Sequence, residues 1–141
     1  MKTYSQKSAE ISREWWVIDA STLPLGKLAV VVADKLMGKS KVTYTPHIDN
    51  GDYVIVTNAK SLKVTGNKLT DKKYYRHSGF PGGLKELRLE EIIEKDPSMA
   101  IKAAVKGMLP KNKLAADRLE RLRIFDGAEH THAAQAPKEI K

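Results

Sequence analysis

The sequence predicts an α/β fold, a three-layer single domain in which helices flank a mostly parallel sheet. Two apolar runs rich in aromatic and β-branched residues, 15–19 and 52–57, are typical of buried strands. Between them, one helical face collects Leu25, Leu28, Ala29, Val32 and Leu36. Strand, helix and strand over this distance form a βαβ unit, so we expect parallel strands joined by a right-handed crossover.

The ends of the first helix are marked in the sequence. Hydroxyl side chains and Pro24 precede the helix, and Gly38 follows it where a left-handed C-cap belongs. A basic loop, 39–50, then leads to the second strand. Shorter strands are predicted at 62–65 and 73–76, with glycine-rich turns after each of them.

The second half of the chain is predicted to be mainly helical. Residues 89–95 carry paired isoleucines, and Asp96-Pro97 supplies an N-cap followed by a first-turn proline. The helix that follows places Ile101, Ala104, Val105 and Met108 on one side and ends before Pro110. A further helix carries Leu114, Leu119 and Leu122, and a last strand is predicted at 123–125.

The length of 141 residues suits one domain. We expect an N-terminal arm at 1–14, an α/β domain at 15–126, and a C-terminal tail at 127–141 that packs on the surface or on a partner. The sequence has no cysteine, which excludes disulfides and fits a reducing compartment. No apolar signal segment is readable, and the longest aliphatic run, 28–33, is too short to cross a membrane, so a cytoplasmic protein is expected.

No motif in the chain predicts catalysis, a cofactor or a metal site. Gly26-Lys27 lacks the earlier glycine and the following hydroxyl of a phosphate-binding loop. The pair His130 and His132 beside Glu129 is too small a set of ligands to indicate a metal. One alternative remains open, a small enzyme acting on a phosphorylated or nucleotide substrate near Asp19, at the end of the first strand.

The charge balance points to a polyanionic partner. Lys and Arg number 25 against 17 Asp and Glu, giving a net charge of +8 and a pI near 9.6. An excess of this size on a small domain is typical of proteins that bind nucleic acid.

The largest basic patch lies between Ile101 and Phe125. It contains Lys102, Lys106, Lys111, Lys113, Arg118, Arg121 and Arg123, and only Asp117 and Glu120 oppose it. Lys102 and Lys106 are four residues apart, and Arg118 and Arg121 three apart, so each pair shares a helix face. We therefore expect these helices to have one core face and one cationic face.

Two further basic segments are separate from the first. The segment 72–77 combines cations with rings, and its members expected to contact RNA are Lys73, Tyr75, Arg76 and His77. Because side chains alternate along a strand, one of its two adjacent tyrosines should point into the core. The loop after the first helix supplies Lys39, Lys41, Thr45 and His47. Three patches on a small domain predict phosphate contacts with several segments of a folded RNA.

Eight short motifs resemble the bacterial large-subunit ribosomal protein L13 family. They occupy 16–20, 25–29, 41–47, 51–53, 64–68, 75–79, 105–110 and 127–137. The resemblance spans about residues 13–138 and is specific because the motifs occur in combination.

The resemblance implies a parallel four-stranded sheet between helices. It also implies ribosomal RNA as main partner, neighbouring large-subunit proteins, a structural role early in assembly, and no catalysis, cofactor or small-molecule substrate. Lys27 opens the first helix, and Lys68, His130 and His132 lie in the matched motifs; these four complete the expected RNA contacts. A basic surface also permits a secondary role in binding messenger RNA.

Overall fold

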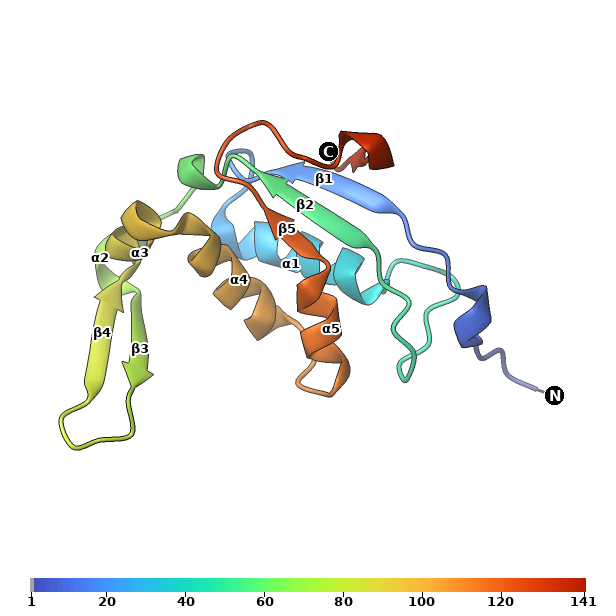
Figure 1. The fold of residues 1–141 in the computed structure, drawn as a ribbon, viewed down its shortest axis with the longest axis horizontal. Helices are drawn as coiled ribbons and strands as arrows, with labels where there is room; N and C mark the ends of the chain where they lie inside the picture. Colours follow the sequence, from blue (N-terminus) through green and yellow to red (C-terminus); the bar gives the residue numbers. More distant parts are fainter. Residues whose placement is uncertain (1) are drawn as a thin grey trace.

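The computed structural model describes residues 2–141. Its central sheet has four parallel strands in the order β5-β2-β1-β6 (Figure 1). The strands are β1 (Trp15–Asp19), β2 (Tyr53–Thr57), β5 (Leu122–Ile124) and β6 (Lys138–Glu139). The predicted α/β class and the parallel βαβ unit are confirmed.

Three helices lie on one side of the sheet (Figure 1). They are α1 (Leu25–Met37), α4 (Pro97–Met108) and α5 (Leu114–Glu120). The main core lies between these helices and the sheet residues Ile18, Val54, Val56 and Leu122. Each such side chain, when fully buried, contributes roughly 1.5–3 kcal/mol to folding. The predicted cap at Gly38 is confirmed, because this residue has a φ of 73° and its amide closes the end of α1.

The opposite face of the sheet is covered by the C-terminal tail. The Trp15 and Tyr53 rings stack there with centroids 4.3 Å apart, and the His132 ring lies 4.9 Å from the Trp15 ring. The tail then forms the short 3-10 helix η3 (Ala133–Gln135) and ends in β6, which pairs with β1. The tail therefore supplies both a third layer and the fourth strand of the sheet.

A β-hairpin extends away from this body (Figure 1). It consists of β3 (Lys73–His77) and β4 (Leu84–Arg88), which pair antiparallel. Two short helices, α2 (Lys68–Asp71) and α3 (Leu89–Lys95), connect it to the body. The strand predicted at 62–65 is absent, because within the described chain that segment makes only the isolated bridge of Lys63 to Pro24.

The N-terminal arm is anchored on the loop that follows α1. It contains η1 (Ser8–Glu10), and η2 (Ala59–Ser61) follows β2 elsewhere in the body. Gln6 is buried, and its amide donates to the Thr45 hydroxyl at 3.3 Å. The Arg13 guanidinium donates to the carbonyl oxygens of Gly51 and Asp49 at 2.6 and 3.1 Å.

Candidate nucleic-acid interface

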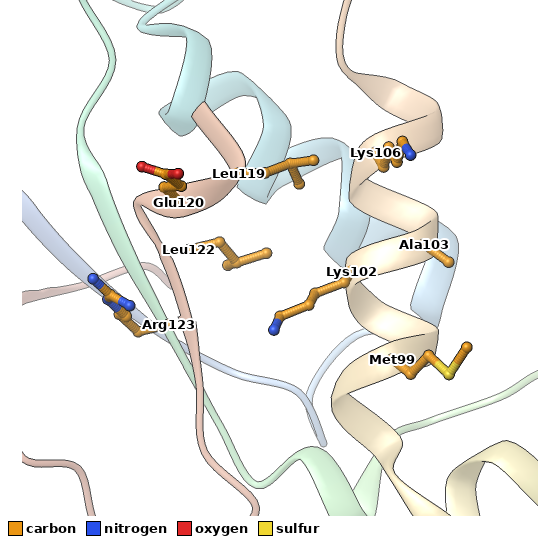
Figure 2. Close-up of a pocket in the computed structure, with 8 residues that line it drawn as sticks. All are labelled: Met99, Lys102, Ala103, Lys106, Leu119, Glu120, Leu122 and Arg123. Atoms are coloured by element: carbon orange, nitrogen blue, oxygen red, sulfur yellow. The ribbon is translucent and has the colours of Figure 1, made fainter. Parts of the chain in front are cut away.

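Helix α4 and strand β5 present cations around a shallow hollow (Figure 2). Lys102 and Lys106 extend from successive turns of α4, and Arg123 lies across the hollow on β5. Glu120 is the one carboxylate in its lining. Between residues 2 and 141, none of these three cations forms a salt bridge. Their charges are thus available to an outside anion.

The loop between α4 and α5 adds two more exposed cations. Lys111 and Lys113 flank Asn112, whose side-chain oxygen accepts a hydrogen bond from the Leu114 amide at 3.1 Å. This bond lies in the turn just before α5 and constrains the end of the loop. Leu109 is buried just before the loop and holds its other end in the core. Lys111 and Lys113 therefore extend the charged surface of α4 from a constrained backbone.

The expectation that Arg118 and Arg121 lie on an outward cationic face is wrong. Their exposed fractions are 1% and 7%. Arg121 donates to both carboxylate oxygens of Asp49 and, at 2.8 Å, to the Leu36 carbonyl oxygen. Arg118 lies 3.5 Å from the Asp49 carboxylate through its Nε atom. The i,i+3 spacing correctly put both on one side of α5, but the partly buried carboxylate of Asp49 makes that the inner side.

Asp49 is negatively charged in this arrangement. Burial alone favours its neutral form, but the hydrogen bonds and charge of Arg121, with the charge of Arg13, lower the pKa of Asp49 overall. The loop after α1 is thereby joined to α5. Arg121 thus stabilises the fold, and neither buried arginine is placed to contact RNA phosphates.

The predicted RNA-binding side chains of the loop after α1 also fall into an inward-facing set and an exposed set. Lys41 pairs with the buried carboxylate of Asp52, with an Nζ–Oδ1 distance of 2.6 Å, and Thr45 is 6% exposed and bonded to Gln6. These two side chains are engaged inside the protein, contrary to the expectation of an RNA-facing patch. Lys39 and His47 are exposed and remain free to contact a partner.

The hairpin presents one of its two adjacent tyrosines, as expected. Tyr75 is 63% exposed, whereas Tyr74 is half-buried against Leu89 and Ile92. Arg76 and His77 are exposed, and the His77 ring nitrogen Nδ1 accepts a bond from the Gly79 amide at 2.9 Å. Lys73 pairs with Glu86 at 2.7 Å, which reduces its availability.

Two apolar side chains of the hairpin were not expected at the surface. Phe80 at the tip is 74% exposed, and Leu84, which pairs with His77 across the strands, is 57% exposed. The sequence offered a signal for Phe80, because it lies in a glycine-rich turn where few side chains can cover it.

His130 and His132 are half-buried and pack against aromatic rings. Their ring centroids lie 6.3 and 5.9 Å from that of Phe125. Both histidines therefore help to hold the tail on the sheet. The part of each ring that stays exposed could also contact a partner. Among residues 2–141 no group of three metal-binding side chains comes together.

The other predicted positions lie at the start of α1, the start of α2 and the end of β1. Lys27 and Lys68 are exposed and line a common hollow beside α1. Asp19 accepts bonds from the Ser21 hydroxyl and amide at 2.7 and 2.8 Å. The Ser21 hydroxyl bond is the main cause that lowers the pKa of Asp19, against the opposing effect of burial. Asp19 thus shapes the turn before α1. No helix in the described chain has the length and apolarity to span a bilayer.

Fold and surface together define a class: a small, basic α/β protein with a packed body and many unpaired surface cations. The family model described as Ribosomal protein L13 matches residues 13–131. Proteins named Large ribosomal subunit protein uL13 from Ectopseudomonas mendocina, Pseudomonas aeruginosa and Pseudomonas putida are 51%, 52% and 52% identical to the chain. Each alignment covers 100% of this chain and 99% of the relative. The chain belongs to the ribosomal protein L13 family, whose members are structural proteins and not enzymes.

Proposed function

We propose that this protein is a structural component of the large ribosomal subunit in the cytoplasm, where it binds ribosomal RNA. Its relatives are named for that subunit. The cations proposed to contact phosphates are exposed and form no salt bridge within residues 2–141; they are Lys39, Arg76, Lys102, Lys106, Lys111, Lys113 and Arg123. The rings of Tyr75 and His77 are available to unpaired bases.

The observation that carries this proposal is the division of the basic residues into two sets. Arg118, Arg121 and Lys41 are turned inward onto Asp49 and Asp52. In the described part of the chain, the cations around α4 have no such carboxylate partner. An unpaired surface cation can replace the counterions of a phosphate backbone without first breaking an internal ion pair.

The arrangement favours a folded RNA over a linear one. The α4 surface, the hairpin and the loop after α1 come from different parts of the chain and project from different places (Figure 1). One RNA that touches all three must bring several of its segments together. A body that is already packed can perform this role early in subunit assembly.

The experiment compares unpaired and paired lysines in the full-length protein. K102A/K106A should reduce the slope of log affinity against log salt for large-subunit RNA by about 2, one for each phosphate that the double variant no longer neutralises. The control K60A/K138A removes the same charge from lysines that have partners in Asp126 and Glu14. Its slope should change much less.

Two results would contradict the proposal. One is an equal change in the salt slope for both double variants, which would show that only the net charge of the protein matters. The other is the absence of the protein from large subunits washed free of loosely bound material, measured by co-sedimentation.

A further inference from the structure

An apolar groove lies beside the amino end of α1 and is also lined by residues of α2 and of the carboxyl end of α4. Two adjoining hollows share Gly26, Lys68 and Met108. The apolar lining of the first consists of Leu23, Pro24, Val30, Val31 and Met108. Val30 and Met108 are 46% and 47% exposed. A soluble protein rarely leaves several such side chains together in water unless they contact a partner.

Two glycines keep the groove open. A Cβ atom built on Gly26 or Gly107 meets no other atom within 4 Å. Neither glycine is therefore required by close packing inside the protein, although Gly26 lies in α1 where glycine is unfavourable by about 1 kcal/mol relative to alanine. Any larger side chain at Gly26 would extend into the groove itself.

The edge of the groove is positive. Among the residues that line the two hollows, the charged ones are Lys27, Lys68 and Lys72, and none is a carboxylate. The described chain shows no salt bridge to any of the three. An occupant that brings carboxylates to this edge would neutralise them.

The chemistry of the lining favours a protein over RNA as the occupant. No aromatic ring and no guanidinium lines either hollow, so nothing there can stack on a base. The apolar floor offers no donor to phosphate oxygens. It does match the apolar side of a short amphipathic segment, which binds a groove through side chains at helical spacing.

We propose that this groove docks a short segment of a neighbouring protein, with apolar side chains on the floor and Asp or Glu side chains at the lysine edge. Lys27 and Lys68, which the sequence alone assigns to RNA, are then assigned to carboxylates of that partner. The first hollow of the groove shares no lining residue with the hollow in Figure 2, and the second shares Ala103 with it. The inference does not depend on the RNA contacts made there.

The test is photo-crosslinking of the full-length protein in cells. A benzophenone amino acid replaces Val30 in one variant and Thr65 in a second; both positions line the groove. The control replaces Val42, which is fully exposed in the loop after α1. We expect groove positions to crosslink to a polypeptide, and the crosslinked peptide to carry apolar residues with a carboxylate within one helical turn.

Further variants test the shape and the charge of the groove. G26L, which fills it, should lower the crosslink yield at least tenfold, whereas G26A should leave the yield nearly unchanged. K27E/K68E should lower it by a similar factor. A crosslink only to RNA, to a second copy of this chain, or to a segment without carboxylates overturns the proposal, and so does no crosslink from either groove position.

Sedimentation of the same samples separates this result from the proposed ribosomal function. A chain that is absent from large subunits but still forms the groove crosslink contradicts the ribosomal role alone. A chain that is present in large subunits without that crosslink contradicts the docking groove alone.

Discussion

Arg121 binds Asp49 and the end of α1 at the same time. Its guanidinium donates to both carboxylate oxygens of Asp49 and to the Leu36 carbonyl oxygen, and its Nε donates to the Asp52 carbonyl oxygen at 3.3 Å. A single side chain from the end of α5 thus connects the helix α1, the loop after it and the start of β2.

Arg121→Met should destabilise the protein by about 3–5 kcal/mol, because it leaves the Asp49 carboxylate partly buried without its main partner. Urea unfolding measures this destabilisation. Arg123→Met is the matched control, since Arg123 is exposed and its replacement should change stability by no more than about 0.5 kcal/mol. Equal stability of both variants would show that Arg121 is not structural.

Arg118→Met should have the opposite outcome. Arg118 is 1% exposed, and none of its guanidinium nitrogens has a hydrogen-bond partner among the described residues. A buried charge without hydrogen bonds is itself destabilising, so an apolar side chain of similar length should be tolerated at this position. The melting temperature should therefore stay the same or rise. A marked fall would show that the 3.5 Å contact with Asp49 is a strong ion pair.

Stability should depend on Asp49 at acid pH. The pKa of Asp49 is lowered in the folded protein, so its contribution is present above the unfolded pKa of about 3.9 and is lost as pH falls through the lower folded value. The free energy of unfolding should decrease with falling pH in this range. D49N should be less stable at neutral pH and should show a flatter decrease; an unchanged acid slope would contradict the assignment.

Gly51 should tolerate no side chain. A Cβ there would overlap the Leu36 carbonyl group and meet the Arg121 guanidinium at 2.6 Å. G51A should therefore destabilise the protein by more than about 3 kcal/mol, as expected for overpacking next to a buried ion pair. G26A is the control, and thermal unfolding should show it to be neutral or slightly more stable.

The two adjacent tyrosines should separate stability from RNA binding. The Tyr74 hydroxyl is buried and has no hydrogen-bond partner between residues 2 and 141, so Y74F should keep stability or raise it by roughly 1 kcal/mol. Y75A should leave the melting temperature nearly unchanged and weaken binding to large-subunit RNA. Loss of RNA affinity in Y74F alone would reverse the assigned roles of the two rings.

The sequence predicted the elements whose patterns are strong and local. The aromatic and β-branched run of β1 and the helical spacing in α1 predicted the βαβ unit. Asp96-Pro97 predicted the start of α4. Strand β4 was missed because Leu84–Arg88 carries few residues that favour strands, and its pairing depends on β3. β6 has only two residues and forms because β1 offers a free edge.

The site was predicted less well than the fold. Charge spacing shows which side chains share a helix face, but whether that face points inward depends on partners distant in sequence. Asp49 lies 72 residues before Arg121, and nothing near Arg121 in the sequence reveals it. The groove beside α1 was equally hidden, because its lining comes from α1, residues 65–68 and the end of α4.

The pairing of β6 with β1 has a consequence for synthesis of the chain. The first strand is made early, but its outer neighbour contains Lys138 and Glu139, which are translated after the other strands of the sheet. Until those two residues leave the exit tunnel, the edge of β1 has unsatisfied amide and carbonyl groups. A chain truncated just before Lys138 would therefore keep an open edge that is prone to self-association.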